Sequence, residues 1–313
     1  MTDNAVRIAY FDCFSGASGD MLLGALLDAG LSLEELRQDL TALDLGGYDL
    51  QVVRQVSHGL SGTRLAVQDL GGEKPARHLS TVRDIIERST LPDEVKTASV
   101  RVFERIARAE ANVHGVDIEA VHFHEIGAVD SIVDIVGFCS AVKRMGLQAL
   151  YASPLPLGSG TIVTEHGLLP VPAPATLALL ADAGAPTCPS PGPGELVTPT
   201  GAALLTTLAT FAQPAMRVQG VGYGFGTKEF PWANALRVWI GEASGKATTV
   251  RNRDACAHAH AHSHEHPHCH EQEHEHEHAH QHVHGGPEHA HPHVHEHAGD
   301  EHMHPHDDEE GTA

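Results

Sequence analysis

Residues 121–131, VHFHEIGAVDS, bring together side chains that could bind a metal ion or move a proton. The alternation of apolar and polar residues in the first half of this stretch predicts a short strand. In a strand, His122 and His124 would point to one face and Glu125 to the other. Imidazole and carboxylate groups suit both a metal site and a general base, so the stretch is a candidate for either.

Two aspartates continue this segment into a predicted helix. The apolar spacing over residues 129–145 is helical, Asp130 stands at its start, and Asp134 lies one turn later on the same face. The alternative is a purely structural role, in which Asp130 caps the helix and Asp134 is a solvated acid of its first turn. We predict as catalytic His122, His124, Glu125 and Asp130, and as metal ligands His122, His124, Asp130 and Asp134.

A small-residue turn, SGASGD at residues 15–20, follows a predicted buried strand over residues 6–14 and opens a helix. Backbone N–H groups at such a helix start can hold a phosphate. Asp12 and Asp20 could serve a divalent ion that such a phosphate carries. The alternative is a tight turn that Asp20 caps. The predicted phosphate-binding residues here are Ser15, Gly16, Ser18 and Gly19.

Three further loops are rich in glycine and polar groups, at residues 158–167, 191–201 and 222–229. His166 in the first loop is a further candidate metal ligand, and Lys228 in the last is available for an anionic ligand such as a phosphate. Each of these signals is weak by itself.

The last sixty residues are dominated by histidine. Of the 27 histidines of the chain, 21 lie between His258 and His306, alternating with acidic residues, and no Lys or Arg follows Asp254. No core can form from this composition, so we predict a disordered tail over residues 246–313 behind a folded domain over residues 1–245. Imidazole binds Ni, Cu and Zn, so the tail should bind divalent ions, for storage or delivery; the alternative is a solubilising linker that binds metal incidentally. The first tail ligands are His258, His260, His262, His264, His266, His268 and His270.

The composition of the remaining chain excludes several protein classes. Before Asp254 there are 27 acidic and 20 basic residues, and aromatic residues make up 4% of the chain, which argues against nucleic-acid binding. The five cysteines are scattered and form no disulfide framework. We see neither a signal peptide nor a membrane span, and expect a cytoplasmic protein.

Strand and helix patterns alternate along the body. A capping box at Ser32 starts one helix, strand patterns flank SHGLSG at 57–62 as in a hairpin, and Pro199 stands at a helix start. Two strand patterns close the body, over residues 216–226 and 234–242. We therefore predict an α/β (mixed α+β) globular body, whose strand order the pattern leaves open.

Five blocks of the sequence together carry a family resemblance. They are DCFSGASGDMLLGALLDAG, VHFHEIGAVDSIVDIVG, LPLGSGTIVTEHGLLPVPAPAT, GELVTPTGAALL and VGYGFGTKEFPWANALRV, in order over residues 12–238. In these blocks and in the histidine-rich segment behind them, the chain resembles the nickel insertion proteins of nickel-pincer cofactor biosynthesis (LarC).

This resemblance implies a reaction, a substrate and partners. The family inserts Ni(II) into pyridinium-3,5-bisthiocarboxylic acid mononucleotide, forming two Ni–S bonds and one Ni–C bond, with hydrolysis of CTP and with Mg or Mn as helper ion. The product is the cofactor of lactate racemase, so apo lactate racemase is an expected partner, and a homo-oligomer is expected. The resemblance implies that the CTP site belongs to a carboxy-terminal domain that this sequence lacks. Either a separate gene or a frameshift supplies that domain, or the chain is truncated.

Two rival functions stay open. The chain could be a nickel store or metallochaperone without catalysis, which would need only the tail. It could also be an unrelated metal-dependent hydrolase that uses the HFHE cluster.

Overall fold

The computed structural model describes residues 6–71, 78–123 and 129–244. The chain divides into two units, Met1–His258 and Ala259–Ala313, and only the first contains described residues. The predicted histidine-rich tail therefore lies outside the described residues.

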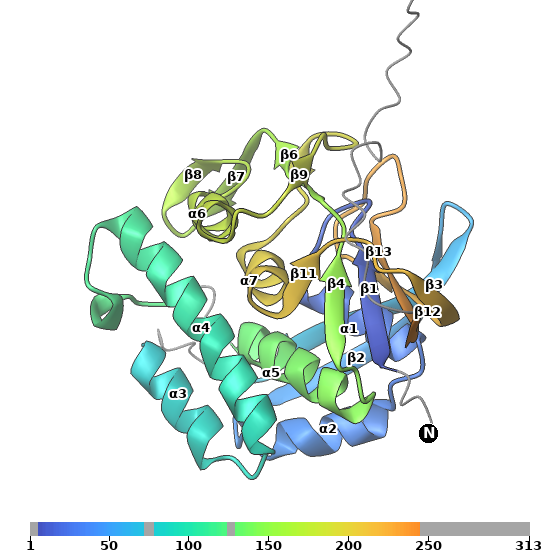
Figure 1. Ribbon diagram of the computed structural model, residues 1–313. Helices are drawn as coiled ribbons and strands as arrows, with labels where there is room; N and C mark the ends of the chain where they lie inside the picture. Colours follow the sequence, from blue (N-terminus) through green and yellow to red (C-terminus); the bar gives the residue numbers. More distant parts are fainter. Residues whose placement is uncertain (1–5, 72–77, 124–128, 245–313) are drawn as a thin grey trace, which may run out of the picture. The chain divides into compact units, whose positions relative to one another are not determined.

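A mixed sheet in the order β11-β4-β1-β13-β12-β3-β2 organises the described residues (Figure 1). Its strands are β1 (Arg7–Asp12), β2 (Tyr48–Ser57), β3 (Leu60–Asp69), β4 (Ala149–Ala152), β11 (Ala209–Phe211), β12 (Met216–Phe225) and β13 (Ala235–Ala243). β4 runs parallel to β1 and β11, whereas β13 runs antiparallel to β1 and β12. Of the two closing strands of the body, β13 thus lies beside β1, and β12 lies beside β13.

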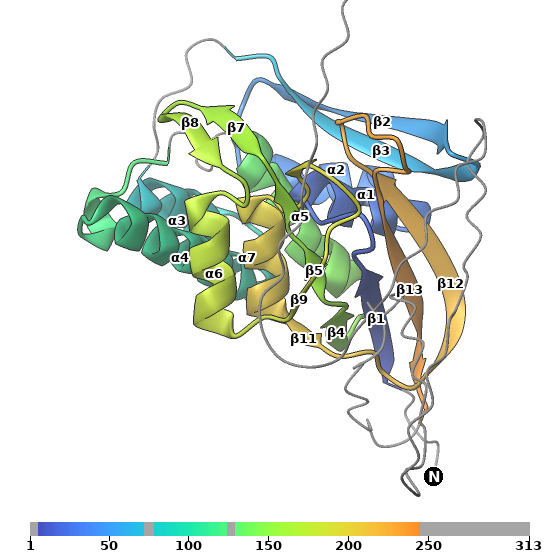
Figure 2. The same ribbon diagram turned by 90° about the horizontal axis from the view of Figure 1, so that it is seen from above.

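The helices gather on one side of this curved sheet (Figure 2). They are α1 (Gly19–Asp28), α2 (Leu33–Thr41), α3 (Leu79–Arg88), α4 (Asp93–His114), α5 (Val129–Arg144), α6 (Pro174–Ala183) and α7 (Pro199–Leu208), with the short 3-10 helix η1 (Ile118–Ala120). Fully buried side chains from β1, α1, α4 and α5 meet there, among them Phe11, Leu22, Phe103 and Phe138. This core confirms the predicted mixed α/β body. In the described part of the chain, no helix is long and apolar enough to cross a membrane.

Short strands pair outside the main sheet, in the loops around α6. They are β5 (Leu155–Pro156) with β9 (Thr187–Cys188), β6 (Gly158–Ser159) with β10 (Gly194–Glu195), and β7 (Thr161–Thr164) with β8 (Gly167–Pro170). The β6–β10 pair joins two of the loops that the sequence marked as glycine-rich.

Local sequence signals explain several element boundaries. The side chain of Ser32 accepts a hydrogen bond from the backbone N–H of Glu35 at 3.3 Å, as the predicted helix start requires. Pro199 occupies the first turn of α7, where its missing N–H is not needed. The turn between β2 and β3 has positive φ at His58 (49°) and Gly59 (77°), which is the geometry of a tight two-residue hairpin. The hairpin prediction is therefore confirmed.

Of the strand predicted over residues 121–126, the structure describes residues 121–123, where Phe123 forms a single β-bridge and no strand of greater length is present. Val121 follows η1 with extended backbone angles, and its carbonyl oxygen lies 3.2 Å from a ring nitrogen of His78. The rest of that stretch, including His124, lies outside the described residues, so the common face of His122 and His124 stays a prediction.

Candidate functional site

The turn between β1 and α1 lies where distant segments of the chain meet. The backbone N–H of Ala17 donates to the carbonyl oxygen of Leu196 at 2.9 Å, and that of Thr198 donates to the carbonyl oxygen of Ala17 at 3.0 Å. Gly16 has a φ of +117°, and a Cβ there would lie 2.0 Å from the Leu196 carbonyl oxygen. Only glycine allows this approach, so the turn is packed tightly against the segment that leads into α7.

The loop between β12 and β13, residues 226–234, contacts the same turn. The indole Nε1 of Trp232 donates to Oγ of the buried Ser15 at 2.8 Å. Lys228 Nζ lies 3.1 Å from Oε2 of Glu195, one residue before the segment that the turn contacts. The ammonium group predicted to meet a phosphate is therefore close to the turn, but it holds a carboxylate there.

The N-terminal ends of α1 and α5 pack directly against each other. A Cβ at Gly19 would lie 2.4 Å from Oδ2 of Asp134. The next residue, Asp20, accepts hydrogen bonds from the Ser18 hydroxyl and from the backbone N–H of Met21, the latter at 2.9 Å. The missing side chain at Gly19 thus lets α5 bring Asp134 beside Asp20. We call these two residues the aspartate pair.

Burial shifts the ionisation of both members of the aspartate pair. It raises the pKa of Asp134 well above its usual 3.8, and the negative charges of Asp20 and Asp130 raise it further. Burial also raises the pKa of Asp20, although local hydrogen bonds and the charge of Arg64 oppose this shift. Oδ1 of Asp134 is buried and has no hydrogen-bond partner within the described residues. A divalent cation would satisfy such an unpartnered buried acceptor beside a second carboxyl group.

The aspartate pair alone does not complete a metal site. No group of three or more His, Cys, Asp or Glu side chains is placed to hold a metal ion in the part of the chain that the structure describes. The predicted ligand His124 and the predicted base Glu125 lie outside that part. Asp20 and Asp134 can supply two carboxylates, which leaves the other coordination positions to other groups.

Two other predicted carboxylates have partners of their own. Oδ2 of Asp12 accepts hydrogen bonds from Nε and Nη2 of Arg237, at 3.1 and 2.5 Å. Asp130 is exposed at the start of α5, where its Oδ1 accepts a hydrogen bond from the backbone N–H of Ser131 at 2.9 Å. Its charge still reaches Asp134. The structure thus brings Asp130 near the aspartate pair and engages Asp12 with a guanidinium.

The two described histidines of the prediction lie against other histidines. The ring of the exposed His122 is centred 4.1 Å from that of His78. The ring of His166, at the β7–β8 turn, is centred 4.8 Å from that of His114 at the end of α4. Neither contact involves the aspartate pair.

Two contacts of this region were not predicted from the sequence, namely the hydrogen bond from Trp232 to Ser15 and the packing of Gly19 against Asp134. Trp232 is one of two tryptophans in an aromatic-poor chain, and that rarity in a polar loop was the available signal. Gly19 was predicted as a phosphate ligand because of its place in the turn. Its contact with α5 could not be inferred without knowing which helices are neighbours.

Comparison with known proteins identifies the family. The family described as "Nickel insertion protein" matches residues 9–260. The chain belongs to the nickel insertion protein family. It is 56% identical to a "Putative nickel insertion protein" of Thermomicrobium roseum over 239 residues, which is 76% of this chain and 59% of that relative. It is 50% identical to the "Pyridinium-3,5-bisthiocarboxylic acid mononucleotide nickel insertion protein" of Desulfitobacterium hafniense strain DCB-2, with the same coverage.

The match to the nickel insertion family contains both the aspartate pair and the β1–α1 turn, since it extends from β1 past β13. The chain spans about three fifths of the length of these relatives. No solved structure matches it.

Proposed function

We propose that this chain holds the nickel ion and the mononucleotide while Ni(II) is inserted into pyridinium-3,5-bisthiocarboxylic acid mononucleotide. The observation that carries the proposal is the aspartate pair, a buried and partly unpartnered carboxylate site beside a turn that can bind a phosphate. Relatives from two strains of Desulfitobacterium hafniense are named for this reaction.

The aspartate pair supplies the first nickel ligands in this proposal. Carboxylate oxygens bind Ni(II) more weakly than imidazole or sulfur does, so a nickel ion held by Asp20 and Asp134 can pass to the sulfur atoms of the substrate. His122, His124 and Asp130 are further candidate ligands close in sequence to Asp134. Asp12 is left out, because it pairs with Arg237. His166 is left out, because it lies in the β7–β8 turn against His114 and is not close in sequence to Asp134.

The insertion also needs a base. When the Ni–C bond forms, the electron pair of the ring C–H bond becomes the Ni–C bond and the proton leaves, while nickel remains Ni(II). Glu125 or an ionised member of the aspartate pair is proposed to take that proton. A carboxylate whose pKa is raised towards the working pH is a stronger base than an ordinary aspartate.

The substrate phosphate is proposed to bind at the Ser15–Gly19 turn, at the N-terminus of α1, with Lys228 nearby. A nickel ion held by Asp20 would offset the repulsion that a phosphate would otherwise meet at this carboxylate. The CTP-dependent step, with Mg or Mn, is proposed to belong to a further carboxy-terminal domain. A homo-oligomer and delivery of the product to apo lactate racemase complete the proposal.

The test is an insertion assay with the purified chain, nickel, the pincer precursor, CTP and Mg or Mn. It is run with and without the carboxy-terminal domain of a relative, and activation of apo lactate racemase reports the product. We expect activation with the added domain and its loss in Asp134→Asn, whereas Asp84→Asn, an exposed acid on α3, should behave like the parent. Insertion by Asp134→Asn at the parental rate would contradict the proposal.

A second candidate function, nickel storage, is favoured by the 21 histidines between His258 and His306. A store needs no ordered site, so nickel binding would survive Asp134→Asn and no condition would yield activated racemase. Deleting residues 254–313 separates the two functions. For an insertion protein the deletion should mainly raise the nickel concentration required.

A further inference from the structure

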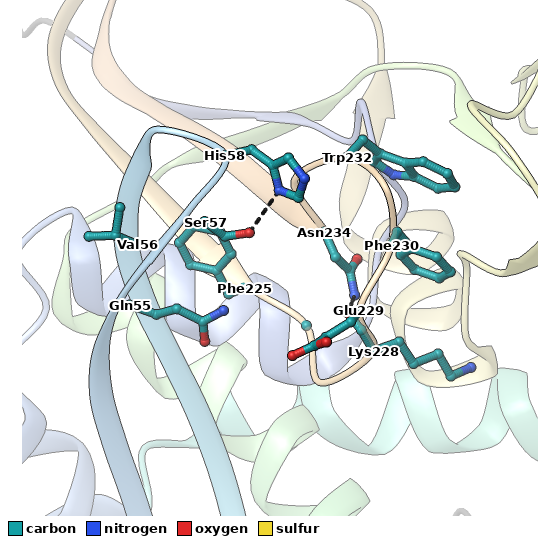
Figure 3. A pocket seen from close by; sticks show the side chains of 11 residues that line it. Gln55, Val56, Ser57, His58, Phe225, Lys228, Glu229, Phe230, Trp232 and Asn234 are labelled. Carbon is teal, nitrogen blue, oxygen red and sulfur yellow. Dashed lines mark hydrogen bonds between the residues drawn. The ribbon is translucent and has the colours of Figure 1, made fainter.

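A cavity of about 220 Å³ lies between the β2–β3 turn and the loop over residues 226–234 (Figure 3). Its polar lining comes from two segments far apart in the sequence, with Gln55, Ser57 and His58 on one side and Lys228, Glu229 and Asn234 on the other. Of these residues, only Lys228 is predicted from the sequence to bind a ligand.

Both walls of the cavity are held by internal hydrogen bonds. Ser57 Oγ lies 3.0 Å from Nδ1 of His58. Asn234 Nδ2 donates to the carbonyl oxygen of Lys228 at 2.8 Å, and the backbone N–H of Gly226 donates to the carbonyl oxygen of Asn234 at 3.0 Å. A ligand that enters such a cavity has little chain to order, which favours specific binding.

Three polar groups on these walls have no hydrogen-bond partner among the described residues. They are the Nε2 atom of His58, the carboxylate of Glu229 and the side-chain amide of Gln55. Figure 3 shows the Glu229 carboxylate turned toward the Gln55 side of the cavity. A carboxylate only accepts hydrogen bonds, whereas an amide also donates them, so the lining suits a ligand with several hydroxyl groups.

The size of the cavity limits what it can hold. Pockets that enclose whole drug-sized ligands have roughly 300–1,000 Å³, so a cavity of about 220 Å³ fits one part of a nucleotide. Carboxylates recognise ribose hydroxyls in dinucleotide-binding folds. We propose that this cavity is a ribose subsite, in which Glu229, Gln55 and His58 bind the 2′- and 3′-hydroxyl groups of the mononucleotide substrate. This inference rests on the proposed function.

The loop that forms the cavity also reaches the proposed phosphate site. Trp232 lines the cavity and donates its indole N–H to Ser15, in the β1–α1 turn. Lys228 lines the cavity as well, and its ammonium group pairs with Glu195 next to that turn. A ribose in the cavity therefore has the proposed phosphate-binding groups beside it, as a 5′-phosphorylated ribose requires.

The test measures binding of ribose 5-phosphate and of 2-deoxyribose 5-phosphate to the full chain by calorimetry. We expect the ribose compound to bind about tenfold more tightly, which is the effect of one hydrogen bond to a charged group. Glu229→Gln should remove most of this preference. His58→Asn should weaken binding of the ribose compound about tenfold while keeping the turn, because asparagine accepts the positive φ of His58.

Control and competing outcomes are built into the same experiment. Glu87→Gln, an exposed acid on α3, should bind both sugars as the parent does. Equal affinity of the parent for the two sugars, or unchanged binding in both cavity variants, would overturn the subsite. Displacement of ribose 5-phosphate by CTP but not by the pincer precursor would also overturn it, because the cavity would then serve the nucleoside triphosphate.

Nickel insertion by the same preparations separates this inference from the proposed function. If the parent discriminates between the sugars but never inserts nickel, the proposed function fails while the ribose preference stands. If the parent inserts nickel and Glu229→Gln has an unchanged KM for the precursor, the subsite fails while the proposed function stands.

Discussion

Asp12 and Asp134 flank the same turn, and the sequence predicts both as metal ligands, but the structure surrounds them differently. Asp12 ends β1 and accepts two hydrogen bonds from the guanidinium of Arg237. Asp134 lies in α5 against Gly19, and its buried Oδ1 has no partner among the described residues. The charge of Asp12 is thus balanced by a guanidinium, whereas Asp134 lies near two further acidic residues.

This difference separates a carboxylate that forms an ion pair from one for which we propose a function. An ion pair satisfies a carboxylate and leaves little reason for a metal ion to bind. A buried carboxyl group near Asp20 and Asp130 is unfavourable by itself, so the fold keeps it at a cost in stability. Such a cost is expected where function requires the group.

The largest expected effect comes from neutralising each aspartate in turn. Asp134→Asn should lower the insertion rate about 100-fold or more, because even groups that only support a metal ligand contribute 10–100-fold. Asp12→Asn should change the rate by no more than about threefold, since a partly exposed ion pair contributes little. The insertion assay measures both.

In Asp134→Asn the unfolding free energy should be kept or increased although the insertion rate falls. Asp134→Asn removes a buried ionisable group and keeps its shape, so its unfolding free energy at neutral pH should equal or exceed that of the parent. A variant that loses activity because it unfolds would have a lower unfolding free energy than the parent. Urea unfolding measures this difference.

The next effect concerns the contact that places Asp134. In Gly19→Ala the new Cβ would lie 2.4 Å from Oδ2 of Asp134, so α1 and α5 must separate, which should lower the unfolding free energy by about 1–3 kcal/mol. Gly220→Ala is the matched control, because a Cβ at Gly220 meets nothing within 4 Å and should be neutral or slightly stabilising. Equal effects of the two substitutions would show that Gly19 does not position Asp134.

The pH dependence of stability tests the raised pKa of Asp134. Above pH 3.8 the unfolded carboxyl group is ionised, whereas the folded one keeps its proton up to its raised pKa. The folded state then binds more protons, so its stability falls as pH rises between these values, by up to about 1.4 kcal/mol per pH unit. The decline should be weaker in Asp134→Asn, as urea titrations from pH 4 to pH 8 would show. Parallel pH profiles would contradict the raised pKa.

Local elements could be predicted from the sequence because their causes are local. The helix that Ser32 caps, the helix that Pro199 opens and the β2–β3 hairpin all appear where the residue patterns place them. Of the short strand predicted from Val121 onward, the described residues contain only a β-bridge at Phe123, because alternation over a few residues does not determine how far a strand pairs.

The arrangement of the candidate site could not be predicted in the same way. Arg237 reaches Asp12 across 225 positions of sequence, because β13 inserts beside β1 in the sheet. The approach of Gly19 to Asp134 likewise depends on which helices become neighbours. The candidate carboxylates could be predicted from residue types and spacing. Only the tertiary contacts show which of them already forms an ion pair.

The smallest effect comes from breaking the ion pair of Asp12. Arg237→Met removes the charge but keeps an apolar side chain near Trp239, over whose ring the guanidinium lies at 5.2 Å. The unfolding free energy should fall by about 0.5–1 kcal/mol at low salt and by less in 1 M NaCl, where the parental pair is screened. Arg237→Lys keeps the charge, so its unfolding free energy should lie between those of the parent and of Arg237→Met. Arg237→Met in an Asp134→Asn background tests the comparison further, because it frees Asp12 in a chain that lacks the proposed nickel ligand Asp134. Recovered insertion there would mean that Asp12 is a latent ligand, whereas no recovery, the expected result, would mean that the buried environment of Asp134 makes the site.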